Sequence, residues 1–259
     1  MKTNYGNWIS TPMMKTLAAI AGGLYVLTTL YALIYDRVTA PFFILAILSF
    51  VATVVVLYMY YCRRFFDFEG GGLMRRIHTY LLDQLPWDGL GRMLEVGCGS
   101  GALSIAAAKQ FPAAKVQGID AWGAMWDYSK DQCDRNAEIE GVGARCTFMP
   151  GDAAKIDFPS KSFDAVISNF VYHEVRTQKD KFMLVEETLR TLKKGGSFAL
   201  QDTFDDKDRY GKMEEFLEYL KEHDDIDDIT YVPNIARHIP MPFLVRFMLR
   251  DCGLIYGRK

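Results

Sequence analysis

The sequence lacks several features that assign a chain to a function class at once. Its 259 residues carry a formal net charge of −2, so they lack the basic excess typical of nucleic-acid binding. We see no internal repeat and no low-complexity tract, which argues against a repeat protein and against a disordered chain. A folded chain that does not bind nucleic acid is expected.

The cysteines do not form a recognisable metal or redox motif. None of the five belongs to a C-x-x-C pair, and none has a histidine at metal-ligand spacing. Ordinary reduced thiols of a cytosolic domain are the simplest interpretation, and no metal site is predicted. The five are Cys62, Cys98, Cys133, Cys146 and Cys252.

Charge is missing from two long apolar runs near the N-terminus. Residues 17–35 and 42–62 contain no charged side chain, and each run has the length of about 20 residues that a helix needs to cross a bilayer. The connection at residues 36–41 is too short to form a domain. We therefore predict a transmembrane helical hairpin over residues 1–64.

The charges that flank the hairpin predict its orientation. The linker carries only Arg37, beside Asp36, whereas the outer flanks are basic, which places both ends in the cytoplasm. A signal peptide is disfavoured because the first run is long and no A-x-A site follows it before the second run begins. Burial in a soluble bundle is disfavoured because the remaining chain is too small to enclose both runs. The flanking basic residues are Lys2, Lys15, Arg63, Arg64, Arg75 and Arg76.

Residues 65–90 are predicted to be a linker followed by an amphipathic helix. Three glycines at 70–72 precede a helical pattern over 73–85 that Pro86 ends. The polar faces of this helix suit solvent or lipid headgroups. Alternatively, the helix and the glycines form a lid over a substrate at the membrane surface.

Residues 91–259 alternate short apolar runs with helical stretches, which predicts a Rossmann-like, doubly wound α/β domain with a mostly parallel sheet. Strands are expected at 92–96, 115–120, 146–150, 163–169, 197–202 and 253–257, and helices at 102–110, 126–140, 180–194 and 210–223. No full sixth strand is recognised, and the acidic run 224–228 is expected to be a solvated loop. Residues 235–249 either lie on the membrane surface or pack on the domain.

A glycine-rich motif lies between the first predicted strand and the first helix of this domain. Residues 95–101 read E-V-G-C-G-S-G, and glycines at such a turn let a ligand approach the main chain. Dinucleotide enzymes carry a similar turn. Glu95, at the strand end, favours a cationic or amine-bearing ligand over a pyrophosphate. The stretch resembles motif I of the class I S-adenosylmethionine-dependent methyltransferases.

This resemblance covers about residues 90–205 and implies S-adenosyl-L-methionine as the cofactor. It implies that the loop binds the cofactor through Glu95, Gly97, Cys98, Gly99 and Gly101. An acid that ends the second strand of a Rossmann-like sheet accepts hydrogen bonds from ribose hydroxyls. Asp120 is the candidate for that role, and a helix N-cap is its alternative.

The same resemblance assigns the residues around the adenine. Ala121 and Trp122 follow Asp120, and Trp122 either stacks on the adenine or packs in the core. In the G-D-A turn after the third strand, Asp152 would accept from the exocyclic amine beside Ala153. Asn169 ends the fourth strand and should converge with these residues on one crevice.

Residues 169–174, N-F-V-Y-H-E, resemble motif IV of small-molecule and lipid methyltransferases. They lack the (D/N)PP(Y/F) signature of enzymes that act on nucleobase and glutamine nitrogens. His173 is expected either as a general base or as a helix cap. Tyr172 is expected to orient the acceptor, and Glu174 is either solvated or orients His173.

Together these features predict an integral membrane methyltransferase with a cytoplasmic catalytic domain, acting on a lipophilic small molecule, a lipid or a quinone-like acceptor. One alternative is a soluble thiol or amine acceptor, with the hairpin serving only as an anchor. Another is a membrane protein that binds S-adenosylmethionine without turnover. A dinucleotide dehydrogenase is disfavoured by Glu95 and by the tight glycine spacing.

Overall fold

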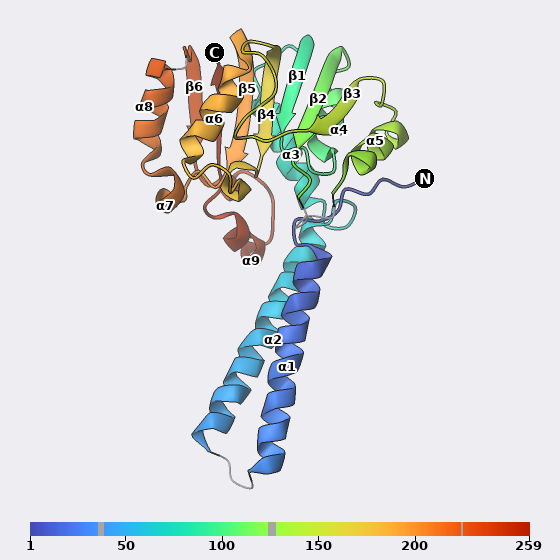
Figure 1. The fold of residues 1–259 in the computed structure, drawn as a ribbon, viewed down its shortest axis with the longest axis vertical. Helices are drawn as coiled ribbons and strands as arrows, with labels where there is room; N and C mark the ends of the chain where they lie inside the picture. Colours follow the sequence, from blue (N-terminus) through green and yellow to red (C-terminus); the bar gives the residue numbers. More distant parts are fainter. Residues whose placement is uncertain (36–38, 124–127, 224) are drawn as a thin grey trace. The chain divides into compact units, whose positions relative to one another are not determined.

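The computed structural model describes residues 1–35, 39–123, 128–223 and 225–259 (Figure 1). It divides into two compact units, one formed by Met1–Tyr5 with Met74–Lys259 and the other by Gly6–Leu73. The predicted linker charges Asp36 and Arg37, the start of the helix expected at 126 and the start of the acidic run at 224 lie outside the described residues.

The smaller unit is a pair of long helices, α1 (Thr11–Ile34) and α2 (Ala40–Phe66). The side chain of Ser10 accepts from the backbone of Met13, which caps the first turn of α1. Across the pair, the hydroxyls of Thr28 and Ser49 lie 3.1 Å apart. Both helices pass the length and hydropathy test for membrane spans, with mean hydropathies of 1.9 and 2.7.

The apolar side chains of these helices mostly face outward. Only 6% of each apolar window is buried, and Leu33, Ile34 and Phe50 are among the most exposed large side chains of the unit. A helix buried inside a soluble bundle would hide such residues. This exposure argues against the soluble-bundle alternative.

The larger unit is built on a seven-stranded sheet with the order β3-β2-β1-β4-β5-β7-β6. The first five strands along the chain are parallel, and β7 pairs antiparallel with β5 and β6. The predicted α/β class is confirmed. The strands are β1 (Gly91–Val96), β2 (Ala114–Asp120), β3 (Cys146–Pro150), β4 (Phe163–Asn169), β5 (Leu192–Asp202), β6 (Asp228–Val232) and β7 (Gly253–Arg258).

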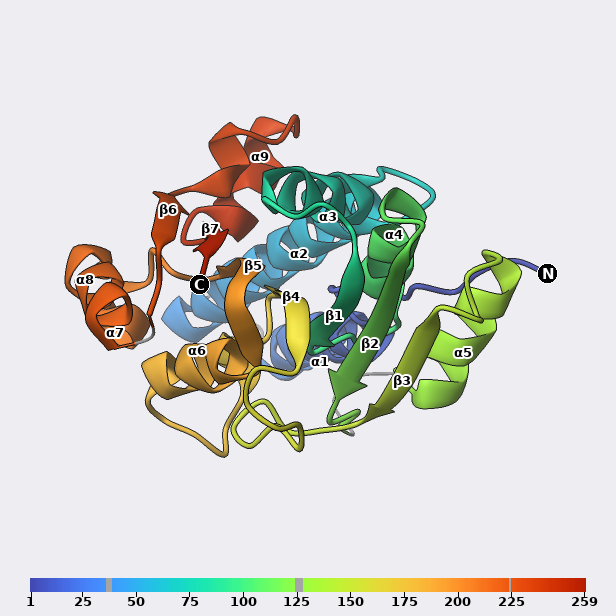
Figure 2. The same cartoon turned by 90° about the horizontal axis from the view of Figure 1, so that it is seen from above.

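Helices cover both faces of this sheet, with α3, α4 and α5 on one face and α6 on the other (Figure 2). The longer ones are α3 (Leu73–Gln84), α4 (Ala102–Gln110), α5 (Lys130–Ile139), α6 (Lys181–Arg190) and α8 (Met213–His223). The short ones are η1 (Tyr172–Glu174), α7 (Lys207–Tyr210), η2 (Ile235–Arg237), α9 (Phe243–Arg246) and η3 (Phe247–Leu249).

Three sequence-based expectations for this unit are wrong. A further strand exists, because the end of the acidic run continues into Ile229–Val232 and pairs with β7 as the sheet edge. The helix expected over 180–194 ends at Arg190, and β5 begins at Leu192 opposite Phe163. The helix expected over 210–223 is broken by Gly211, whose φ of 58° lies in the left-handed region.

Candidate active site

The carboxyl ends of the central strands lie side by side at one edge of the sheet. Val96 of β1 is in register with Ile119 of β2 and with Ser168 of β4. Asp120 is in register with Pro150 at the end of β3. The segments that follow these strands are therefore neighbours, at the edge where open parallel sheets bind ligands.

The glycine loop after β1 has a backbone that other residues would not adopt easily. Gly97, Gly99 and Gly101 have φ values of 77°, 53° and 78°. A Cβ on Gly97 would lie 2.1 Å from Cγ2 of Val171. The N–H groups of Gly97 and Cys98 both donate to the carbonyl of Ile119, which fixes the loop over the end of β2.

Asp120 joins the end of β2 to this loop. Its Oδ2 accepts from the N–H of Gly99 at 2.8 Å, and its Oδ1 accepts from the N–H of Trp122 at 2.7 Å. Ser129 is the residue that caps α5, so Asp120 is not the cap of that helix. A carboxylate can accept about four hydrogen bonds, which leaves capacity on both Asp120 oxygens.

Trp122 lies against the loop. Its backbone is left-handed, with a φ of 42°, and its indole Nε1–H donates to the carbonyl of Gly99 at 2.8 Å. The residue is half-buried, and Ala121 before it is exposed. The indole is thus held at the ligand-binding edge, where a planar group could stack on it.

Glu95 lies beneath the loop. It is 2% exposed, and its carboxyl accepts a hydrogen bond from the hydroxyl of Ser104. Burial raises the pKa of Glu95 to about 8, although the bonds from Ser104 act in the opposite direction. This placement favours support of the loop from below over the direct ligand contact expected from the sequence. Cys98 is also buried, and its N–H and carbonyl are bonded to Ile119 and Gly101, so it too supports the loop.

Two further predicted residues lie at the same edge. Asp152, half-buried in the turn after β3, accepts from the N–H of Ala154 at 2.8 Å. Ala153 beside it is buried. Asn169, at the end of β4, accepts from Nε2 of Gln201 at 2.8 Å. Asp152 and Asn169 keep exposed surface, as a ligand contact requires.

His173 forms a close pair with an acid at the end of β5. Its Nδ1 lies 2.9 Å from Oδ1 of Asp202, which is fully buried, and its Nε2 lies 3.5 Å from Oε1 of Glu174. Burial alone would lower the pKa of His173, but hydrogen bonds with both acids outweigh it and raise the pKa to about 9. At neutral pH the pair is therefore an imidazolium and a carboxylate.

Asp202 is the residue that the sequence analysis missed. Burial would raise its pKa, but the bond and the charge of His173 hold the pKa below its ordinary value. Its Oδ2 accepts from the N–H of Tyr172 at 2.8 Å, so the same carboxylate fixes the start of η1. The sequence contained a signal for it, because Asp202 is an acid at the end of β5, just as Asp120 is an acid at the end of β2.

Tyr172 does not face the site. It is fully buried, and its hydroxyl donates to Oγ1 of Thr188 on α6 at 3.0 Å. The side chain belongs to the core cluster that also contains Leu184 and Phe198. Its expected role toward an acceptor is therefore corrected, since η1 turns this ring inward.

The first residues of the chain also reach the glycine loop. The hydroxyl of Ser100 donates to the carbonyl of Tyr5 at 2.9 Å. Nδ2 of Asn136 donates to the carbonyls of both Asn4 and Ser100. The N-terminal segment thus braces the loop against α5, and no sequence motif indicated this contact.

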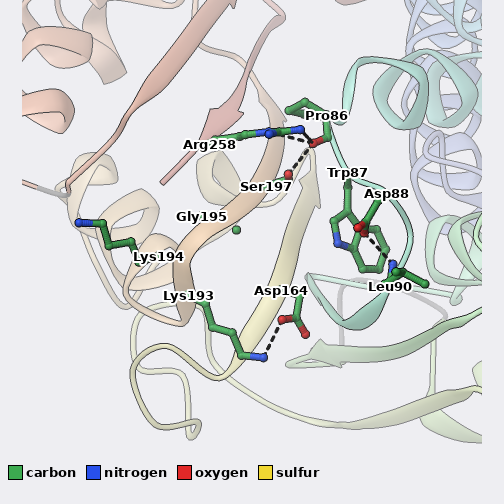
Figure 3. A pocket seen from close by; sticks show the side chains of 11 residues that line it. Pro86, Trp87, Asp88, Leu90, Asp164, Lys193, Lys194, Gly195, Ser197 and Arg258 are labelled. Carbon is green, nitrogen blue, oxygen red and sulfur yellow. Dashed lines mark hydrogen bonds and ion pairs between the residues drawn. The ribbon is translucent and has the colours of Figure 1, made fainter.

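A pocket of about 260 Å³ lies at the opposite edge, among the starts of β1, β4 and the bulged part of β5 (Figure 3). Lys193 pairs with Asp164 at 2.6 Å beside it. Ser197 and Arg258 both donate to the carbonyl of Pro86. These polar groups are engaged with one another, and the pocket contains none of the predicted site residues.

Comparison with known proteins agrees with this geometry. Residues 93–196 match the family model described as "Methyltransferase domain". That segment includes the glycine loop, Asp120, Asp152, Asn169 and His173, but not Asp202. The chain therefore carries a methyltransferase domain over these residues.

Curated relatives of this chain include methyltransferases. A sterol 24-C-methyltransferase of Aspergillus fumigatus is 32% identical over 49% of this chain and 32% of its own length. A fatty-acid O-methyltransferase of Mycolicibacterium smegmatis is 34% identical over 43% of this chain and 36% of its own length. A ubiquinone/menaquinone biosynthesis C-methyltransferase of Dinoroseobacter shibae is 28% identical over 50% of this chain and 49% of its own length. The match thus spans less than half the length of these three relatives.

Solved structures share the fold. A phosphoethanolamine N-methyltransferase of Haemonchus contortus in complex with S-adenosyl-L-methionine has a TM-score of 0.53 and 19% identity, and the match covers 73% of this chain and 53% of that one. The [4+2]-cyclase SpnF has a TM-score of 0.52 and 20% identity, and the match covers 71% of this chain and 80% of that one. One architecture thus serves two chemistries, and this likeness concerns the fold alone.

Proposed function

We propose that this protein is an S-adenosylmethionine-dependent methyltransferase that acts at the cytoplasmic face of a membrane on a lipophilic small molecule, a lipid or a quinone-like acceptor. The observation that carries the proposal is the bond between the N–H of Gly99 and Asp120, which unites the glycine loop with the acid of β2. Both residues lie inside the segment that matches the methyltransferase domain.

The residues at the edge fit this cofactor in chemistry. Asp120 and Asp152 each spend one or two acceptor positions on backbone N–H groups and retain others for ribose hydroxyls and for an exocyclic amine. Trp122 offers an aromatic surface beside them. Gly97 to Gly101 let the ligand approach the main chain, and Asn169 offers an amide next to it. When bound, the cofactor supplies an activated methyl group.

The role of the chain in methyl transfer is mainly positional. An in-line displacement needs donor and acceptor to be aligned and kept dry, and such orientation supplies roughly 7–11 kcal/mol in favourable cases. At neutral pH His173 is a cation held by Asp202. A cation there suits an acceptor that arrives as an anion, such as a phenolate or a carboxylate. It acts as a general base only in its neutral, alkaline form.

The membrane part of the proposal is supported by the two apolar helices and by connectivity. Residues 1–5 belong to the same unit as the methyltransferase domain, so the chain leaves that unit before α1 and returns to it after α2. If α1 and α2 each cross the membrane once, the chain returns to the side on which it started. The basic flanks of the hairpin favour the cytoplasm for that side. Relatives named for sterol, fatty-acid and quinone substrates support a lipophilic acceptor.

Two experiments test the proposal in sequence. Calorimetric titration of the full chain in detergent with S-adenosylhomocysteine, beside NADH, tests the cofactor. Incubation with methyl-labelled S-adenosylmethionine and either a lipid extract or a water-soluble extract then tests the acceptor. Label in the organic phase is expected, and label only in the aqueous phase supports a soluble acceptor. Cofactor binding without release of S-adenosylhomocysteine from either extract would identify a protein that binds but does not turn over.

A further inference from the structure

The connection between β6 and β7, residues 233–252, presents apolar side chains outward. Phe243 is 70% exposed, Phe247 53%, Leu244 49% and Met248 37%. They fall on α9 and η3, two short consecutive helical turns. Four large apolar side chains so close together on one surface segment are unusual for a water-facing surface.

The inner side of the same segment is fixed to the domain. Ile239, Val245 and Leu249 are buried. The N–H of Ile235 donates to the carbonyl of Cys252, which closes the connection at its base. The ring of His238 stacks on Tyr80 of α3, with centroids 5.9 Å apart. The segment that carries the outward side chains is therefore fixed in place on the domain.

The register of the sheet places this segment at the ligand-binding edge. Gly253, where β7 begins, pairs with Asp202, and Leu254 pairs with Val232, where β6 ends. Asp202 in turn holds His173. Figure 1 shows α9 at the same end of the sheet as α7, which follows β5. The exposed cluster thus lies at the edge that carries the candidate active site.

The charges around the cluster indicate what it contacts. Residues 229–250 contain no acidic side chain, but they contain Arg237, Arg246 and Arg250. All three arginines are exposed, and only Arg250 has an ion-pair partner, Asp251, among the residues that the structure describes. Apolar tips surrounded by cations suit a bilayer with anionic headgroups, where such segments insert about 5–10 Å.

We propose that Phe243, Leu244, Phe247 and Met248 insert into the headgroup region of an anionic lipid surface and bring the His173–Asp202 edge to the bilayer. This inference rests on the proposed function, because a lipophilic acceptor would then enter the site from the lipid. The surface is a contact separate from the hairpin: it orients the domain, whereas the hairpin tethers it.

A fluorescent probe on this cluster tests the proposal without any enzymatic step. The full chain carries a polarity-sensitive thiol label at Leu244→Cys, or at Leu90→Cys as the matched control. Leu90 is 60% exposed and precedes β1 at the opposite edge of the sheet. The five native cysteines are buried, which directs the label to the introduced thiol.

In nanodiscs of phosphatidylcholine and phosphatidylglycerol, the label at position 244 is expected to shift to the blue and to lose emission when nitroxide-labelled lipid is present. The label at position 90 should do neither, and replacement of Phe243 and Phe247 by Asp should abolish the effect at 244. Equal, water-like emission at both positions would overturn the proposal. A blue shift of the label at position 244 that appears in detergent without lipid, and grows with protein concentration, would also overturn the proposal. It would indicate that the cluster contacts a second copy of the protein. Calorimetry with S-adenosylhomocysteine on the same samples reports separately whether the proposed function itself fails.

Discussion

Nδ1 of His173 lies 2.9 Å from Oδ1 of Asp202, a carboxylate without exposed surface at the end of β5. The bond connects the tail of β4 to the tail of β5 at the edge where the candidate cofactor residues meet. A buried carboxylate behind a half-exposed imidazole fixes both its orientation and its charge. This pair gives the site its most specific testable properties.

The first prediction concerns the proton on His173. Asp202→Asn removes the carboxylate whose bond and charge raise the pKa of His173 to about 9. Burial, which lowers the pKa, is then opposed only by the bond and the charge of Glu174, so the pKa of His173 should fall below about 9. NMR titration of the imidazole measures the shift. Glu174→Gln is the graded control and should move the pKa less, because its oxygen lies 3.5 Å from the ring rather than 2.9 Å.

The second prediction concerns stability against pH. A histidine pKa raised in the folded state adds stability that is complete below its unfolded value of 6.5 and is lost as pH rises through about 9. The lowered pKa of Asp202 adds stability that is present above 3.8 and is lost as pH falls. The loss in unfolding free energy caused by Asp202→Asn should therefore be larger near pH 6 than near pH 10. Asp131→Asn on α5 is the control. If Asp202→Asn lowers the unfolding free energy equally at pH 6 and pH 10, the ion pair between His173 and Asp202 is contradicted.

The third prediction concerns turnover. His173→Ala should slow methyl transfer and leave the affinity for S-adenosylhomocysteine unchanged, because the proposal assigns the cofactor contacts to other residues and gives His173 a role only toward the acceptor. If His173 acts as a general base, the rate should rise with pH toward about 9. If its cation binds an anionic acceptor, the rate should fall over the same range. Full activity of the variant at every pH would remove His173 from the site chemistry.

The fourth prediction concerns Asp120. Asp120→Ala removes an acceptor that holds the N–H groups of Gly99 and Trp122 and is assigned to the ribose. Bonds to charged groups contribute about 1.5–3 kcal/mol each, so affinity for S-adenosylhomocysteine should fall by about 10- to 100-fold. Calorimetry measures it, and circular dichroism checks that the fold is retained. Asp131→Ala should bind as the wild type does.

The fifth prediction separates the two properties of Trp122. Trp122→Phe keeps an aromatic ring but removes the Nε1–H that donates to Gly99, whereas Trp122→Ala removes both. If the ring stacks on the adenine, affinity should fall by a few-fold in the first variant and by about tenfold or more in the second. Equal affinities for both variants and the wild type would show that the indole does not touch the cofactor.

The sequence was informative wherever the determinant is local. Gly97, Gly99 and Gly101 require left-handed backbone that only a tight turn uses, and Asp120 follows an apolar run at the end of a strand. Such signals lie within a few residues of each other. The strands β1 to β4 and the loop between β1 and α4 could therefore be predicted with nearly correct boundaries, whereas the start of β5 could not.

The sequence was uninformative wherever distant residues decide. Tyr172 and His173 are adjacent, but η1 sends the first into the core and the second to the site because Asp202, about 30 residues later, holds the backbone of η1. β6 begins with an acid and exists as a strand because β7 pairs with it. The contact between Tyr5 and Ser100 spans 95 positions and has no local signature.

The measurement that tests the central claim most directly is calorimetric titration of the detergent-purified full chain with S-adenosylhomocysteine, with NADH as the comparison ligand. S-adenosylhomocysteine should bind with roughly micromolar affinity, and NADH should give no heat of binding. The Asp120→Ala variant should bind S-adenosylhomocysteine more weakly than the wild type does. Absence of S-adenosylhomocysteine binding by folded protein would reduce residues 95–101 to a structural turn and contradict the assignment of the site.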